Sequence, residues 1–403
     1  MKSTVMKGGI TAPKGFRASG VHAGIKPPSN LDLALIYSDT DAVMAGVFTK
    51  NCLPAAPVIL DRQRLKTHKG RAIIINSGNA NACTGNPGIQ DAKTMTRLLA
   101  DHANIPASQV FVASTGIIGH PLPISTIAKA VPSLVKKIRK GGHLDAAKAI
   151  MTTDTVYKEC ALAIPLGSYS VTIGGMAKGS GMIHPDMATM LAFITTDASI
   201  SPKTFQKALT LAVDQSFNCI SVDGETSTND MVLAMANGIA EYPVLQPHTK
   251  AMQCFQDGLS KVCKTLALKV CHDGEGQTKV VLVRVQGARS TNQAKKIAHT
   301  IVTSPLVKTA LFGEDPNWGR VMAAIGRAGV PVNPKSIDLY FDNIQVVEGG
   351  LGLHSTNLKL AKRIMKQSSF EVTVSLGKGP GTFQFWTNDL THDYITINTA
   401  YPT

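Results

Sequence analysis

Hydrophobic positions along the chain follow two spacings in turn, which predict strands and helices. Short runs rich in Val and Ile, bounded by Gly, Pro and Asn, are typical of strands. After Ser201 and Pro202, which suit an N-cap and a first helical position, hydrophobic residues recur at the spacing of a helix with one buried face. The predicted strands are Leu33–Tyr37, Ala42–Phe48, Ala72–Ile75, Val110–Ala113, Val171–Ile173, Lys279–Val285, Ile337–Phe341 and Phe370–Ser375.

A second helix is predicted where Ala294, Ile297, Ala298 and Ile301 share one side. Helices are interspersed with strands, so the pattern indicates an α/β or α+β class rather than all-β. The chain has 403 residues, of which 44% are hydrophobic. That length can bury a large core, arranged as one big domain or as two lobes.

The charge is strongly basic, because 41 Lys and Arg residues exceed 27 Asp and Glu residues by 14. Such a balance can attract nucleic acid or an anionic membrane, and it also attracts small acidic substrates. The charges are dispersed, however, and the densest run, Lys136–Lys140, resembles the solvated last turn of a helix. A basic nucleic-acid-binding protein therefore remains only an alternative interpretation.

Cysteine usage and hydropathy both bear on location. The seven cysteines are odd in number and form no CxxC pair, which argues against a disulfide framework and a zinc site and for a reducing compartment. No stretch approaches the roughly 18 apolar residues of a membrane span. We therefore expect a cytoplasmic protein without a membrane partner.

One segment, residues 174–193, begins as a glycine-rich loop and ends in an apolar run that opens with Thr189. The loop is not a phosphate-binding loop, because Lys178 is followed by Gly179. A threonine hydroxyl is a weak nucleophile unless a base activates it, and an N-terminal threonine carries its own α-amine for that purpose. Cleavage after the small residue Ala188 would create such an N-terminus. A structural threonine at the start of an apolar element fits the same spacing.

Positions 179–191 read GSGMIHPDMATML. They resemble the signature of the ornithine acetyltransferase family, whose precursors cleave themselves between the Ala and the Thr of this motif. The one departure is Asp186, where the family more often has Asn. Other segments resemble the family in the same order, so the resemblance spans nearly the whole chain. They are TAPKGF at 11–16, NSGNANA at 76–82, STGIIG at 114–119, MTTDT at 151–155, SVDGETSTND at 221–230, GEDPNWGR at 313–320 and INTAYPT at 397–403.

The resemblance implies an αββα layered sandwich with a smaller C-terminal lobe, which we expect to begin near residue 275. It also implies two chains, 1–188 and 189–403, that remain one folded unit and assemble as an α2β2 heterotetramer. The implied activity is glutamate N-acetyltransferase in arginine biosynthesis: Thr189 takes acetyl from N-acetylornithine and passes it to glutamate. Some family members also accept acetyl-CoA as a donor. The transfer needs no cofactor and no metal.

Site residues are likewise implied by the resemblance. Thr189 would be the nucleophile, and Thr115 with Gly116 would form the oxyanion hole. Without the resemblance, the Ser-Thr-Gly sequence there is simply a turn. The implied substrate contacts are Thr152, Lys178, Thr189, Glu275, Asn398 and Thr403, although Thr153 beside Thr152 leaves that register open.

Two further alternatives stay open at the sequence level. An N-terminal-nucleophile aminopeptidase or amidase would use the same device with water as the acceptor. A metal site is a weaker hypothesis: the acidic residues Asp223, Asp230, Glu314 and Asp315 match no calcium or zinc spacing.

Overall fold

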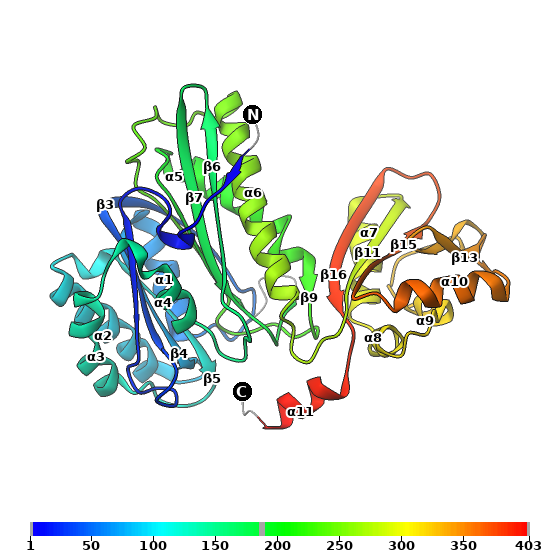
Figure 1. Ribbon diagram of the computed structural model, residues 1–403, viewed down its shortest axis with the longest axis horizontal. Helices are drawn as coiled ribbons and strands as arrows, with labels where there is room; N and C mark the ends of the chain where they lie inside the picture. Colours follow the sequence, from blue (N-terminus) through cyan, green and yellow to red (C-terminus); the bar gives the residue numbers. More distant parts are fainter. Residues whose placement is uncertain (1–2, 185–189, 401–403) are drawn as a thin grey trace.

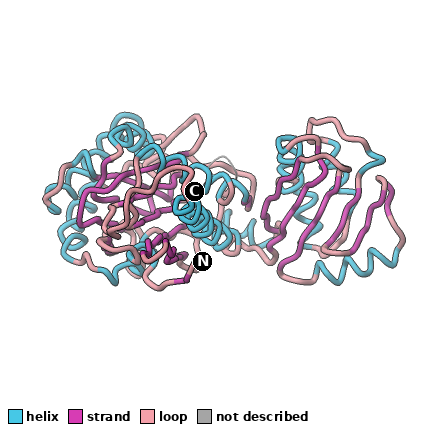
Figure 2. Tube along the Cα trace, turned by 90° about the horizontal axis from the view of Figure 1, so that it is seen from above, coloured by secondary structure: helices cyan, strands magenta, loops and turns pink. Residues whose placement is uncertain are grey.

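The computed structural model describes residues 3–184 and 190–400, which form two lobes lying side by side (Figure 1). Within these residues, a nine-stranded sheet forms the centre of the larger lobe and a seven-stranded sheet that of the smaller lobe. Helices pack on both sheets (Figure 2), so the mixed class predicted from the hydrophobic pattern is confirmed.

The large sheet has the order β1-β6-β7-β8-β10-β3-β4-β5, and β2 pairs with β3. The two strands predicted at 33–37 and 42–48 are one strand, β3, because the exposed polar residues 39–41 continue the strand instead of turning it. The bounds are β1 (Thr4–Val5), β2 (Phe16–Val21), β3 (Leu33–Phe48), β4 (Lys69–Asn79), β5 (Val110–Ile117), β6 (Lys158–Leu166), β7 (Tyr169–Lys178), β8 (Leu191–Thr196) and β10 (Met231–Ala236).

The larger lobe has four layers, and strand alternation shows how they form. In β3, Leu33 and Leu35 pack toward one group of helices, while Ala34 and Ile36 join a central core. In β8, alternate residues likewise divide between the central core and a second group of helices. The central core thus contains side chains from both halves of the sheet, which face each other. This arrangement is the αββα sandwich that the resemblance implies.

Two helical layers cover the outer faces. Helices α1 to α3 pack on β2–β5, α5 packs mainly on β3, and α6 packs on β6 and β7. Helix α5 begins as predicted, because Ser201 accepts a hydrogen bond from the amide of Thr204. The bounds are α1 (Ala56–Arg64), α2 (Gly85–Ala103), α3 (Ile124–Lys136), α4 (His143–Ala149), α5 (Pro202–Asp214) and α6 (Lys250–Cys271).

The smaller lobe has the strand order β14-β13-β12-β15-β11-β16-β9 and its own core. Its edge strand β9 comes from the segment before β10, so a piece of chain from the larger lobe completes the second sheet. The bounds are β9 (Ile220–Ser221), β11 (Val280–Ala288), α7 (Thr291–Val302), α8 (Pro305–Phe312), α9 (Trp318–Gly326), β12 (Asp338–Phe341), β13 (Ile344–Glu348), β14 (Leu351–Gly352), α10 (Ser355–Met365), β15 (Ser369–Ser375) and β16 (Gly381–Asn388).

The last helix, α11 (His392–Ala400), leaves the smaller lobe and returns beneath the larger one (Figure 1). It buries no residue of its own, so polar contacts hold it in place. Among the residues described, we find no helix with the length and hydropathy needed to cross a membrane.

Candidate functional site

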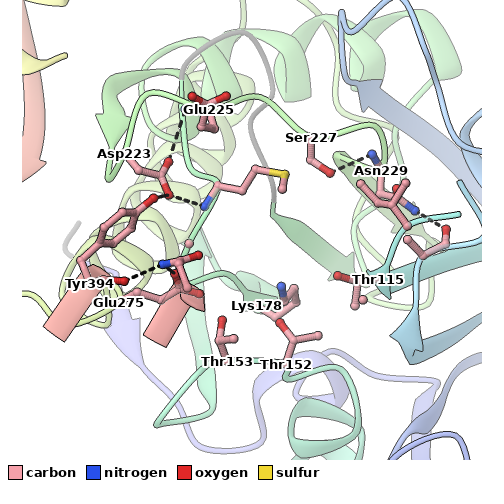
Figure 3. Close-up of a pocket in the computed structure, with 16 residues that line it drawn as sticks. Thr115, Thr152, Thr153, Lys178, Asp223, Glu225, Ser227, Asn229, Glu275 and Tyr394 are labelled. Carbon is pink, nitrogen blue, oxygen red and sulfur yellow. Dashed lines mark hydrogen bonds between the residues drawn. The ribbon is translucent and has the colours of Figure 1, made fainter. Parts of the chain in front are cut away.

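A cavity of about 220 Å³ lies where the ends of β5 and β7, the loop before β10 and the loop after α6 meet α11 (Figure 3). Six of the residues implied by the resemblance line it, together with Thr153. These six are Thr115, Gly116, Thr152, Lys178, Glu275 and Asn398. The remaining three, Ala188, Thr189 and Thr403, lie outside the described residues.

Thr115 and Gly116 lie at the carboxyl end of β5, beside the parallel strand β4. Gly116 has a φ of +132°, and a Cβ there would lie 2.3 Å from the carbonyl carbon of Gly78. Only glycine therefore fits this close approach of the two strands. Thr115 is buried, and its hydroxyl makes no hydrogen bond to the described part of the protein. The hydroxyl is thus available to a ligand in the cavity.

Lys178, the last residue of β7, lies on the cavity wall between Thr115 and the acidic end (Figure 3). Its side chain is 3% exposed, and within residues 3–184 and 190–400 its ammonium has no hydrogen-bond or ion-pair partner. Burial lowers the pKa of Lys178 below that of an ordinary lysine, and the nearby Asp154 opposes this shift. A buried cation that no described side chain pairs with suits an anionic ligand.

The acidic end of the cavity combines Glu275, Asp223 and Glu225 with two residues of α11. Asn398 Nδ2 donates to Glu275 Oε2 at 2.8 Å, and Tyr394 Oη donates to Asp223 Oδ2 at 3.2 Å. The cavity therefore carries a cation in its middle and carboxylates at one end. This charge pattern suits a ligand with a carboxylate and an ammonium group.

The loop between β9 and β10, residues 222–230, anchors the chain on either side of residues 185–189. Asp223 accepts hydrogen bonds from the amides of Met182 and Ile183, at 2.5 and 2.9 Å. Asp230 Oδ1 accepts from the Met190 amide at 3.0 Å, and its fully buried carboxyl has a pKa raised well above the usual range by burial. Asn229 links the loop to β5 through the Ser114 carbonyl. Met182, Ile183 and Met190, which flank residues 185–189, are thus held through their backbone amides.

Several residues in or beside the cavity were not predicted from the sequence. Tyr394 is an ordinary helix tyrosine by its pattern, and only the return of α11 brings it to the cavity. Asp154, Lys158 and Asp273 form a buried ion-pair network below Lys178. For this network, the four-residue spacing of Asp154 and Lys158 is the only hint in the sequence. The pairing of Lys158 with Asp273, 115 residues away, leaves no sequence signal.

The acidic residues considered for a metal serve other contacts. Asp223 and Asp230 bind backbone amides, and Glu314 pairs with Lys279 at 3.2 Å. The described residues contain no group of three or more His, Cys, Asp or Glu side chains that could hold a metal ion.

Comparison with known proteins gives matches over nearly the whole chain. The ArgJ family model matches residues 17–403. The chain is 45% identical over 400 residues to the arginine biosynthesis bifunctional protein ArgJ of Symbiobacterium thermophilum, covering 99% of both chains. It is 46% identical over 403 residues to the protein of the same name from Caldanaerobacter subterraneus subsp. tengcongensis, covering 99% of this chain and 100% of the relative.

Among solved structures, the arginine biosynthesis bifunctional protein argJ of Bacillus halodurans matches with 40% identity and a TM-score of 0.50. The match covers 98% of that chain but only 52% of this one. The solved polypeptide is therefore about half as long as the chain described here.

Proposed function

The chain belongs to the ArgJ family of bifunctional arginine-biosynthesis enzymes, and we propose that it is a glutamate N-acetyltransferase that moves acetyl from N-acetylornithine to glutamate. Thr189 carries the acetyl group between the two substrates in a ping-pong reaction. Acetyl-CoA is a second acetyl donor in this proposal. The enzyme works in the cytoplasm and needs no cofactor.

One observation carries the proposal: the buried ammonium of Lys178, which has no hydrogen-bond or ion-pair partner among residues 3–184 and 190–400, lies in a cavity between the Thr115 hydroxyl and a set of carboxylates. Both substrates carry an α-carboxylate, which pairs with Lys178. N-acetylornithine also carries an ammonium group, which suits Glu275. The residues at the opposite end, Thr115 and Gly116, would then face the acetyl carbonyl.

The reaction proceeds by two acyl transfers. The Thr189 hydroxyl attacks the acetyl carbonyl, and its proton passes to the Thr189 α-amine. The Thr115 hydroxyl and the Gly116 amide stabilise the oxyanion that develops on the acetyl oxygen. The C–N bond breaks, the leaving nitrogen takes the proton, and ornithine departs. The neutral amine of glutamate then attacks the acetyl-Thr189 ester, and N-acetylglutamate leaves as the threonine hydroxyl is restored.

Self-cleavage prepares the nucleophile. The Thr189 hydroxyl attacks the Ala188 carbonyl, and the peptide C–N bond breaks as an ester forms, which frees the Thr189 α-amine. Water then hydrolyses the ester and releases the Thr189 hydroxyl and an Ala188 carboxylate. The half-length polypeptide of the Bacillus halodurans relative supports a division near the middle of the chain. Residues 1–188 and 189–403 stay together and assemble further as α2β2.

Intact-protein mass spectrometry under denaturing conditions tests the cleavage. We expect two chains that divide between Ala188 and Thr189. A chain that stays uncut after long incubation would remove the mechanism.

Labelled acetyl on N-acetylornithine tests the transfer. The label should appear in N-acetylglutamate when glutamate is present. Release of labelled acetate alone, with no transfer to glutamate, would instead identify an amidase.

A further inference from the structure

A buried ion-pair network lies next to the cavity wall, among residues that do not line the cavity. Lys158, the first residue of β6, is 0% exposed. Its Nζ lies 2.6 Å from Asp154 Oδ1 and 2.6 Å from Asp273 Oδ2. A buried charge is costly unless it is paired and hydrogen-bonded, so these three residues depend on one another.

Both carboxylates of the network also hold loops that carry substrate contacts. Asp154 accepts from the Thr152 amide at 2.9 Å and from the Gly179 amide at 2.8 Å, next to Lys178. Asp273 accepts from the Thr155 amide at 3.0 Å. Its own carbonyl accepts from the Ser180 hydroxyl.

Asp154 interacts with two lysines, Lys158 and Lys178, but it forms an ion pair only with Lys158. Burial alone would raise the pKa of Asp154, but Lys178, Lys158 and the Gly179 amide outweigh it and hold that pKa at about 2. Asp154 is therefore ionised, and its carboxylate is bonded to Lys158 and not to Lys178. Without Lys158, the cations left to interact with this buried carboxylate would be Lys178, which acts strongly on its pKa, and Lys26.

We propose that Lys158 is a positioning residue that keeps Asp154 engaged, so that the ammonium of Lys178 stays available for a substrate carboxylate. This inference rests on the proposed function for the identity of the substrates. Lys158 acts through Asp154 and does not contact the ligand. Its positive charge also lowers the pKa of Lys178, as does burial, while Asp154 raises it.

The first experiment compares the cleaved wild-type enzyme with Lys158→Met and with the double variant Lys158→Met/Asp154→Asn. In the single variant, Asp154 should turn to Lys178 and raise the KM of both substrates by about 10-fold or more, with kcat within about 3-fold. The double variant removes the competing carboxylate as well. Its KM should fall at least about 3-fold below that of the single variant, without full recovery, because the asparagine cannot accept from both the Thr152 and the Gly179 amides.

A KM unchanged in Lys158→Met, or a double variant as impaired as the single one, would overturn the proposal. If Lys158→Met does not fold, Lys158→Gln takes its place in the comparison with the corresponding double variant, and the same order of KM values is expected. Failure of both variants to fold also refutes it, because the network would then be a requirement of folding.

A second experiment does not depend on which substrates the enzyme uses. Labelling of Lys178 with isotopic acetic anhydride, read by peptide mass spectrometry at a series of pH values, follows the titration of its amine directly. The midpoint should move to higher pH in Lys158→Met and return toward the wild-type value in the double variant. An unmoved midpoint sinks the inference even if acetyl transfer is established, and a moved one supports it even if the substrates differ.

Discussion

The cavity depends most on one side chain, Lys178, which is buried yet lacks a protein partner in the described residues. Water solvates most lysine ammonium groups, but here a ligand must take that role. Because burial lowers the pKa of Lys178, the ammonium loses its proton at a lower pH than an exposed lysine would. The affinity for carboxylate substrates should therefore fall as the pH rises through that lowered pKa.

Lys178→Met keeps the length of the side chain and removes its charge. Loss of a charged hydrogen bond should raise the KM of N-acetylornithine and of glutamate by roughly 10–100-fold, with a smaller change in kcat. The KM of the variant should also no longer rise with alkaline pH. Steady-state kinetics at several pH values would show both effects, and a native KM would contradict the role of Lys178.

Thr115→Ala removes the hydroxyl at the other end of the cavity. If that hydroxyl binds the developing oxyanion, kcat should fall by roughly 10–1000-fold while the fold stays intact. Thr115→Ser is the matched control, because it retains a hydroxyl and should retain most of the activity. Equal turnover in the alanine variant and the wild type would remove Thr115 from the oxyanion hole.

Among single residues, the sequence predicted the site residues that lie in recognisable motifs, but it missed the contacts between residues that are far apart in the chain. The resemblance identified Thr115, Lys178 and Glu275, and all three line one cavity. It gave no role to Lys158, because the pairing with Asp273 joins residues 115 positions apart. Nothing in the local pattern around either residue indicates that both are buried.

Among the elements, α11 lines the cavity although it contributes no residue to a hydrophobic core. It buries none of its residues, and among the residues described three hydrogen bonds connect it, and Thr391 just before it, to the loops that follow β9 and α6. Two of these contacts go to Asp223 and Glu275 in the cavity, and Thr391 donates to the Gly276 carbonyl at 2.7 Å. The helix therefore adds the last wall of the cavity.

Deletion of residues 392–403 should accordingly separate activity from stability. Since no core residue is lost, the melting temperature should stay within a few degrees of the full chain, while the KM of both substrates rises strongly. Thermal unfolding and kinetics on the same preparation would test this. Tyr394→Phe, which removes a single contact, should give a milder rise. A large drop in the melting temperature would instead make α11 part of the core.

Element predictions succeeded where hydrophobic residues face a core and failed where polar residues continue a strand. The helix after Ser201 and the strands around the central core follow their periodicity. The sequence pattern predicts two strands in place of β3, because residues 39–41 are polar. In the structure, these three residues form an exposed stretch of one long strand. The packing of the two halves of the sheet against each other was implied only by the family resemblance. The alternation of hydrophobic and polar residues along a strand does not show which two sheet faces pack together.

For the whole molecule, the buried network affects stability as well as binding. The pKa of Asp154 is held at about 2, below its ordinary value of 3.8, so its contribution is complete above about pH 4 and is lost as the pH falls through 2. The size of that contribution is about 2 kcal/mol. The network joins the segment before the proposed cut to the segment after it, through Lys158 and Asp273.

Urea unfolding of the wild type and of Asp154→Asn, measured between pH 7 and pH 2, would test this contribution. The wild type should be the more stable at neutral pH, and the difference in unfolding free energy should shrink as the pH approaches 2. A difference that does not depend on pH would show that Asp154 stabilises the fold by packing and not by its charge.

Strand β8 pairs with β7 on one side and with β10 on the other. These neighbours come from opposite sides of the proposed cut, so an intact chain reaches this pairing as a single molecule. After the cut, an unfolded sample would have to bring two separate polypeptides together before β8 could pair again. Refolding would then become second order, with a half-time that lengthens on dilution. A mature enzyme that unfolds at low concentration would therefore rarely recover, while its uncut precursor still would.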